Sequence, residues 1–175
     1  VILRAAVQYR DFGYGEPVLV GRTDAVLAKM AELGVADAAS YEIHNSKDSV
    51  HVDAMAAMLY ERLQRRGFTE RDVGRMVNQD RNIFASGLLK LGVGDAMITG
   101  MTRTFAQSIS EVRQVLDAKE NQLPFGIHVM IAKNSTVFLA DTTVNERPSA
   151  EDLAVIATHT ASVARRLGHE PRVAF

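Results

Sequence analysis

A short apolar run ends at a glycine directly before a segment that carries two hydroxyl groups and an arginine. The run occupies residues 94–99, and it is followed by Gly100 and then by Thr102, Arg103 and Thr104. An amphipathic stretch comes next, so the pattern predicts a strand, a turn and the N-terminus of a helix. The free backbone amides at such a terminus, together with the helix dipole, favour anions such as phosphates.

Each of these residues has a part in the predicted phosphate site. Gly100 lets backbone and ligand approach closely, and the side chains of Thr102, Arg103 and Thr104 can donate to phosphate oxygens. The spacing also fits a second interpretation, in which Gly100 only ends a strand and Arg103 is a solvated charge. Because joins of strand, glycine and helix occur throughout α/β folds, spacing alone favours this second interpretation.

Two further polar residues follow a predicted strand. Asp141 and Asn145 come just after the apolar run 136–140. The carboxyl ends of strands line the ligand crevice in open α/β sheets, so both residues are candidates for ligand binding. Asp141 fits a cap or an Asx turn equally well. The residues alone therefore predict an anion-binding site near 100–104 and 141–145, without a complete catalytic set.

Other kinds of site find little support in the sequence. None of the five histidines forms an i, i+4 pair with a nearby acidic ligand, and there is no cysteine to supply a thiolate, so no metal site is expected. The sequence also lacks a Gly-x-Ser-x-Gly nucleophile elbow, a P-loop and a dinucleotide-binding glycine triplet.

The composition narrows the classes of partner. Across 175 residues the formal net charge is −1, which gives no electrostatic case for nucleic acid or an anionic membrane. No apolar run reaches the length of a membrane span, and the absence of cysteine fits a reducing compartment, so the expected location is cytoplasmic. The abrupt ends at Val1 and Phe175 predict a fragment of a longer protein.

Helices alternate with short apolar strands along the chain. This order predicts a layered α/β fold with a mostly parallel sheet, to which a β-hairpin adds an antiparallel part. Helices are expected over 2–12, 23–33, 52–66, 69–92, 102–116 and 149–167, and strands over 17–21, 41–44, 95–99, 126–132, 136–140 and from 173 onward. A polar break over 117–122 predicts a boundary between a first lobe, 1–119, and the start of a second, 120–175.

Several segments resemble one known family in their order and content. The chain is similar to the phosphate acetyl/butyryl transferase family over nearly its whole length, at residues 3–6, 17–21, 94–100, 138–145, 148–157 and 170–174. Residues 138–145 carry the most specific part of the likeness. The resemblance implies a two-lobed, isocitrate/isopropylmalate dehydrogenase-like fold, usually dimeric, in which CoA and an acyl phosphate meet in the cleft between lobes.

The chain departs from this family where the chemistry would take place. Active phosphotransacetylases carry a His-Ser-Thr-x-Asp-Thr-x-Arg-Pro segment at the positions occupied here by residues 103–111. The aspartate of that segment falls on Gln107 and its arginine on Ser110. Loss of a charge-assisted donor in a water-poor site costs a few kcal/mol of transition-state stabilisation. The resemblance therefore implies no catalytic residue in this chain.

The divergent version resembles the C-terminal phosphotransacetylase-like domain of hybrid malic enzymes. The resemblance implies that an N-terminal module, absent here, holds NADP and a divalent metal and converts malate oxidatively to pyruvate. The fused domain is expected to bind acetyl-CoA as a regulatory ligand and to assist assembly into a homo-oligomer, a dimer or larger. The ligand-binding residues implied are Gly100, Thr102, Arg103, Thr104, Asp141 and Asn145.

Three hypotheses about function remain open at this point. The first is a regulatory domain that binds acyl-CoA. The second is a working phosphate acetyltransferase that moves an acetyl group between acetyl phosphate and CoA. The third is an oligomerisation module without ligand, whose apolar helix faces at 52–66 or 153–167 pair between subunits. The residues and the resemblance favour them in this order.

Overall fold

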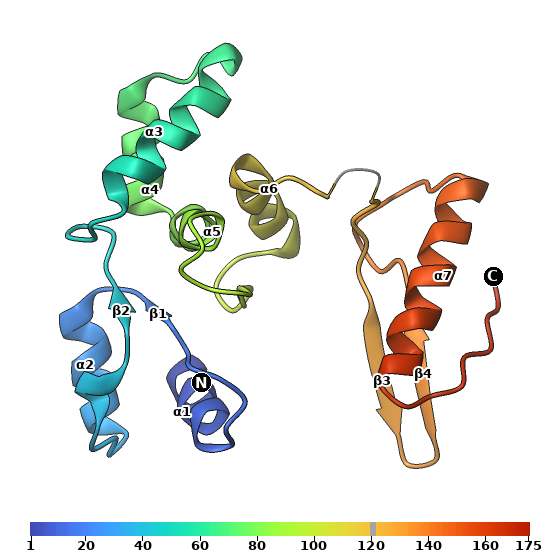
Figure 1. Ribbon diagram of the computed structural model, residues 1–175. Helices are drawn as coiled ribbons and strands as arrows, with labels where there is room; N and C mark the ends of the chain where they lie inside the picture. The colour runs from blue at the N-terminus through green and yellow to red at the C-terminus, as the bar shows by residue number, and fades with distance from the viewer. Residues whose placement is uncertain (120–121) are drawn as a thin grey trace. The chain divides into compact units, whose positions relative to one another are not determined.

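The computed structural model describes residues 1–119 and 122–175 (Figure 1). The described chain forms two compact units, Val1–Asp117 and Ala118–Phe175. The predicted lobe boundary between 119 and 120 touches residues 120–121, which lie outside the described residues. The first unit contains α1 (Ile2–Asp11), β1 (Leu19–Val20), α2 (Thr23–Glu32), the 3₁₀ turn η1 (Ala38–Ser40), β2 (Ile43–His44), α3 (Val52–Leu63), the 3₁₀ turn η2 (Gln64–Arg66), α4 (Glu70–Gln79), α5 (Arg81–Lys90) and α6 (Phe105–Val115). The second contains β3 (His128–Ala132), β4 (Ser135–Leu139) and α7 (Ala150–Arg166).

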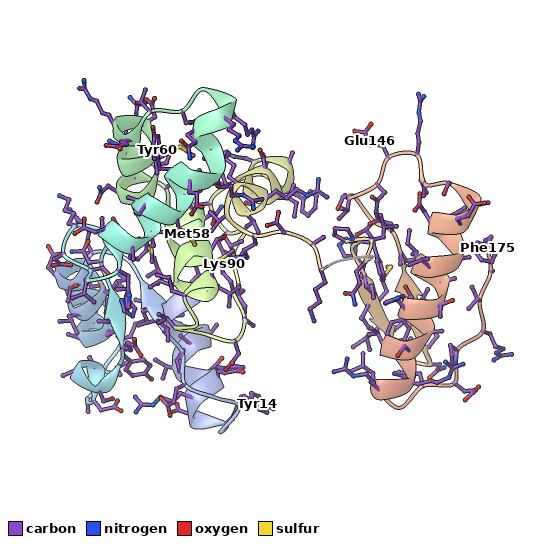
Figure 2. The ribbon with its side chains drawn as sticks, turned by 45° about the horizontal axis from the view of Figure 1, so that its top comes forward. Tyr14, Met58, Tyr60, Lys90, Glu146 and Phe175 are labelled. Atoms are coloured by element: carbon purple, nitrogen blue, oxygen red, sulfur yellow. The ribbon has the colours of Figure 1, made fainter. Side chains whose placement is uncertain are left out.

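The N-terminal part of the first unit is a small parallel β-α-β arrangement. β1 pairs with β2 in parallel, with Leu19 opposite Ile43, and α2 connects them. Leu19, Met30 and Tyr41 form its buried core. Figure 2 shows Tyr14 on the turn that follows α1, where its ring lies 5.6 Å from that of Tyr9 and stays exposed.

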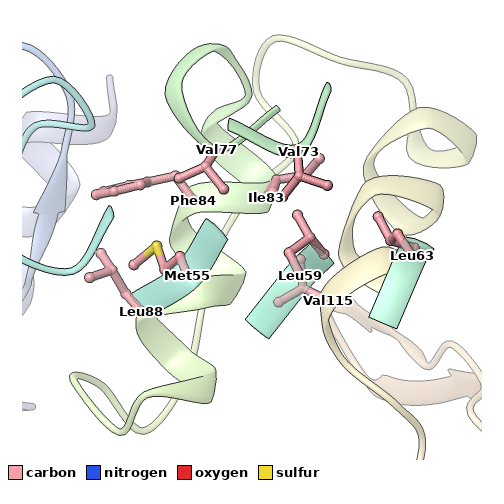
Figure 3. Close-up of a cluster of buried hydrophobic side chains, with 9 residues drawn as sticks. All are labelled: Met55, Leu59, Leu63, Val73, Val77, Ile83, Phe84, Leu88 and Val115. Atoms are coloured by element: carbon pink, nitrogen blue, oxygen red, sulfur yellow. The ribbon is translucent and has the colours of Figure 1, made fainter. Parts of the chain in front are cut away.

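The larger core of the first unit is helical. Apolar side chains from α3, α4, α5 and α6 meet in one cluster (Figure 3), which consists of Met55, Leu59, Leu63, Val73, Val77, Ile83, Phe84, Leu88 and Val115. α3 and α5 approach closely at Gly87, where a Cβ would come within 2.7 Å of the Met55 sulfur. This packing fixes α5 and α6, the two helices that carry the candidate site.

One predicted helix, over 69–92, is in fact two. The chain leaves the helical conformation at Asp80, with φ −105° and ψ 110°, and α5 begins at the next residue. The Asp80 side chain accepts hydrogen bonds from the backbone amides of Asn82 and Ile83, so it acts as the N-cap of α5. The single-helix prediction was wrong because the polar stretch 78–82 contains Asp80, which ends one helix and caps the next.

The sheet also differs from the prediction. Residues 95–99 and the segment from Val173 form no strand, because no other strand of the described residues pairs with them. The predicted mostly parallel sheet is therefore replaced by two separate two-stranded sheets, one parallel and one antiparallel. The α/β class is confirmed, and the layered sheet is not.

The hairpin and the helix of the second unit match their predictions. β3 and β4 form the expected antiparallel hairpin, with His128 opposite Leu139 and Ala132 opposite Ser135 (Figure 1). α7 starts with the expected capping box, in which the side chains of Ser149 and Asp152 bond reciprocally to each other's backbone amides. Among the described residues, no helix combines the length and apolar character that a membrane crossing requires.

Candidate functional site

Arg103 lies just before α6, and its guanidinium sits between two carboxylates. Its Nη1 donates to Asp80 Oδ2 at 2.8 Å and also to Glu111 Oε1. The side chains are 28% exposed for Arg103, 17% for Asp80 and 9% for Glu111. Burial by itself lowers the pKa of Arg103, but the two carboxylates outweigh it and hold that pKa above its ordinary value. One permanent cation is thus matched by two acidic side chains.

A second layer of hydrogen bonds holds Glu111 in place. Asn82 Nδ2 donates to Glu111 Oε2 at 2.6 Å, and Thr99 Oγ1 donates to Asn82 Oδ1 at 2.5 Å. Asn82 and Glu111 are both buried. The segment 95–99, α5 and α6 are therefore tied to one another by a polar network with Arg103 at its outer end.

The other predicted residues at this helix start are placed as follows. Thr104 is the N-cap of α6, and its hydroxyl accepts from the Gln107 amide at 3.3 Å. Gly100 and Thr102 are exposed, and Gly100 has a φ of +120°, a conformation that glycine adopts without strain. The predicted helix N-terminus is confirmed, and Arg103 is not the solvated charge of the alternative interpretation. Phosphate binding at this terminus stays a prediction.

Asp141 occupies a different environment, in which its carboxylate accepts five hydrogen bonds. Oδ1 accepts from the amides of Gly126, Thr143 and Val144, and Oδ2 accepts from the amide and the side chain of Asn145. Burial by itself raises the pKa of Asp141, but these donors outweigh it and lower the pKa to about 2. The contact from Thr143 is the Asx turn that the sequence left open.

The loop around Asp141 is closed by its neighbours. Asn145 Nδ2 also donates to the Pro124 carbonyl at 3.0 Å. A Cβ on Gly126 would come within 2.6 Å of the Thr142 hydroxyl, so only glycine fits there without a shift. Asp141 and Asn145 thus organise the loop that precedes α7, and their binding of a ligand stays a prediction.

The six predicted binding residues fall into the two units. Gly100, Thr102, Arg103 and Thr104 belong to the first unit, and Asp141 and Asn145 belong to the second. Each group is locally assembled. That both groups line one cleft remains a prediction of the sequence.

Comparison with known proteins identifies the family of this chain. The sequence pattern described as phosphate acetyl/butaryl transferase matches residues 1–175. The chain belongs to this family.

The relatives include malic enzymes as well as phosphotransacetylases. The chain is 38% identical over 175 residues to the NADP-dependent malic enzyme of Rhizobium meliloti (strain 1021), a match that covers 99% of this chain and 23% of that protein. It is 36% identical to the probable NADP-dependent malic enzyme of Rickettsia prowazekii (strain Madrid E), with the same coverage. The resemblance that the sequence indicated is confirmed. The chain spans about a quarter of the length of these curated relatives.

A solved structure supports the same family assignment. The crystal structure of a phosphotransacetylase from Streptococcus pyogenes superposes with a TM-score of 0.85 and 28% sequence identity. The match covers 97% of this chain and 51% of that one. The fold of this phosphate acetyl/butaryl transferase family member is therefore similar to that of a phosphotransacetylase.

Sequence reasoning missed four residues of the Arg103 network in this family member. Three of them, Asp80, Asn82 and Glu111, lie on α5 and α6 or directly before α5, and the fourth, Thr99, lies in the segment before α6. Ser108, Glu111 and Val115 recur at helical spacing, which places Glu111 on the helix face of the apolar Val115, but only the structure shows that this face is buried. A glutamate on a buried helix face calls for a partner, and Arg103 is the cation at the start of that helix.

A shallow hollow of about 190 Å³ lies elsewhere on the first unit. It is lined by residues of α3, α5 and α6, two of which, Met58 and Lys90, are labelled in Figure 2; the full set is Met58, Leu59, Glu61, Arg62, Lys90 and Val115. None of the six predicted binding residues lines this hollow.

Arg62, which lines this hollow, binds Asp117 at the end of the first unit. Its guanidinium donates to Asp117 Oδ2 at 2.5 Å and to Asp117 Oδ1 at 2.6 Å, and it reaches the Arg113 carbonyl at 3.2 Å. The hydrogen bonds from Arg62 hold the pKa of Asp117 below its ordinary value. Within residues 1–119 and 122–175, no group of three or more His, Asp or Glu side chains is arranged to hold a metal ion.

Proposed function

We propose that this chain is the C-terminal, phosphotransacetylase-like regulatory domain of an NADP-dependent malic enzyme, and that it binds acetyl-CoA without transferring acetyl groups. In this proposal the oxidative decarboxylation of malate to pyruvate, with NADP and a divalent metal, belongs to the rest of the protein. The similarity to two malic enzymes over 175 residues supports the parent activity.

The finer features of the proposal follow from the family. We propose the two-lobed isocitrate/isopropylmalate dehydrogenase-like fold, with assembly into a dimer or larger homo-oligomer. A cytoplasmic location belongs to the same proposal. The match of the family pattern to all of residues 1–175 supports the fold in this proposal.

The contacts of Arg103 carry the argument against acetyl transfer. Its guanidinium is already bound by Asp80 and Glu111. An acyl phosphate brings two negative charges, and its transfer needs donors that are free to meet the charge of the transition state. Ser110 stands where active family members place an arginine, so the start of α6 offers no second guanidinium.

The same helix start keeps features that suit a larger anionic ligand. The first turn of a helix presents free amides, Gly100 permits close approach, and Thr102 has an exposed hydroxyl. Acetyl-CoA carries several phosphates and a long chain, so its binding does not depend on one guanidinium. A regulatory ligand needs affinity only, whereas turnover needs stabilisation of a transition state.

Isothermal titration of acetyl-CoA into the protein tests the proposal. We expect saturable binding at millimolar ligand or below. Replacing Gly100 with valine blocks the approach to the helix start and should weaken binding, whereas the matched replacement of Gly92, a glycine of positive φ after α5, should not. Absence of heat at millimolar acetyl-CoA, or equal binding by both variants, contradicts the proposal.

The similarity to a phosphotransacetylase structure favours an active phosphate acetyltransferase as the second candidate. This candidate requires CoA-dependent release of phosphate from acetyl phosphate, and Arg103→Ala should abolish that release. We expect no release above the uncatalysed rate. Activity that disappears in Arg103→Ala would replace the regulatory proposal with the catalytic one.

A further inference from the structure

We propose that Asp80 and Glu111 form a carboxylate clamp that makes the start of α6 selective against small dianions, such as inorganic phosphate and acyl phosphates. The inference rests on the proposed function for the ligand that the site accepts, acetyl-CoA. The exclusion of small phosphates is a separate property, and it is measured separately. Asp80 and Glu111 would then be specificity-determining residues of the site.

Counting charges gives the first reason for this selectivity. The guanidinium of Arg103 supplies one positive charge, and the carboxylates of Asp80 and Glu111 supply two negative charges. A phosphate that arrives at the first turn of α6, free or as part of acetyl-CoA, therefore meets a cluster whose formal charge is already negative. Since like charges in a partly buried site repel strongly, the helix amides alone must offset this repulsion when the ligand is a small dianion. Acetyl-CoA has further groups whose contacts can offset this repulsion, whereas a small dianion has none.

The second reason is that neither carboxylate can move aside cheaply. Glu111 is buried, and its second oxygen accepts from Asn82, which is held in turn by Thr99. Asp80 uses its other oxygen to cap α5. If Arg103 turned to a phosphate, both carboxylates would stay near their positions without a cation, and an uncompensated buried charge is unfavourable.

The clamp can be opened by one substitution that keeps its shape. In Glu111→Gln, the amide oxygen can accept from Arg103 while the amide nitrogen faces Asn82. Asn82 can then turn its own amide, and the Thr99 hydroxyl can accept where it donated, because hydroxyls and amides serve in both directions. In Asp80→Asn, the amide oxygen keeps the cap of α5, so this second variant removes a charge by an independent route.

The test is a calorimetric titration, in which inorganic phosphate is added to the protein at constant ionic strength. Wild type, Glu111→Gln, Asp80→Asn and the double variant Arg103→Gln/Glu111→Gln are compared, and circular dichroism checks that each is folded. We expect each single variant to bind phosphate at least about tenfold more tightly than wild type. We expect the double variant to lose this gain, because the released guanidinium is absent.

Two outcomes overturn the clamp. They are phosphate binding that is no tighter in either folded single variant than in the wild type, and a gain that persists in the double variant. If Glu111→Gln does not fold, Asp80→Asn decides by itself. A failure of acetyl-CoA to bind the wild type contradicts the proposed function and leaves the phosphate comparison intact, so the two failures are distinguishable.

Discussion

Arg103 and Asp141 were both predicted to meet a ligand, and the protein uses both for its own contacts. They differ in how their charge is satisfied. Asp141 accepts five hydrogen bonds from neutral donors, four of them within four residues of it and the fifth from Gly126. Arg103 instead meets two carboxylates supplied from α6 and from the residue before α5. The neutral donors around Asp141 stabilise its own loop. The two carboxylates around Arg103 leave a net negative charge, which in our proposal determines which ions can approach the start of α6.

The largest effect is expected from Asp141→Ala. The change leaves the amides that faced the carboxylate without an acceptor, so the free energy of unfolding of the second unit should fall by about 3 kcal/mol. Hydrogen exchange over residues 126–145 measures it. Asp141→Asn keeps one acceptor oxygen and should lose about half as much. Equal losses in both variants would mean that the hydrogen bonds are not the cause.

Lowering the pH should produce the next largest effect, again in the second unit. The pKa of Asp141 is about 2 in the folded protein and 3.8 for an unperturbed side chain, so the carboxylate stabilises the fold fully above about pH 4. This stabilisation, about 2 kcal/mol, should be lost as the pH falls from about 4 towards 2. Unfolding by urea across this range measures it. Wild type and Asp141→Asn should converge at the acid end, and a constant difference between them contradicts the assignment.

Arg103→Met should destabilise the first unit by a smaller amount. The methionine retains the apolar length of the side chain and removes the cation, which leaves Asp80 and Glu111 facing each other. Because all three side chains keep some exposure, we expect a loss of about 1–2 kcal/mol, below the range for fully buried pairs. In a Glu111→Gln background the same change should cost less, and urea denaturation of the four proteins measures this coupling. Additive losses would show that Arg103 and Glu111 act independently.

Arg62→Ala should have the smallest effect. The pair with Asp117 has two-point geometry, but the side chains are 32% and 62% exposed, so water and salt compete with it. We expect a loss of about 0.5–1 kcal/mol that shrinks at high salt. Arg62→Lys keeps the charge without the two-point contact, so it should retain part of the stability that Arg62→Ala loses. A loss that does not depend on salt would indicate packing instead of charge.

Local signals in the sequence were sufficient for the hairpin and α7 of the second unit, and insufficient for the strands predicted at 95–99 and from 173 onward. The hairpin 126–140 and the capping box at Ser149 depend on neighbouring residues, and the structure contains both. Residues 95–99 carry the composition of a strand, but a strand also requires a partner that supplies hydrogen bonds, and no such partner is found among the described residues. The composition of a segment indicates whether its side chains are buried and which secondary structure they prefer. It does not indicate whether another strand lies beside the segment.

The candidate site divides in the same way. A helix start near residue 102 was predicted from the amphipathic stretch, and α6 begins at Phe105 after the N-cap Thr104. The alternative role of Asp141 in an Asx turn was also predicted, and the structure contains that turn. The partners of Arg103 were not predictable from spacing, because Asp80 lies 23 residues away and was hidden inside a supposed continuous helix. Packing of α5 against α6 creates this contact, and no local rule anticipates it.

The contact between Arg62 and Asp117 has a mechanical consequence. The Arg62 guanidinium donates to both carboxylate oxygens of Asp117, the last residue of the first unit, and to the Arg113 carbonyl in the last turn of α6. Fraying of the last turn of α6 therefore requires the loss of these contacts with α3.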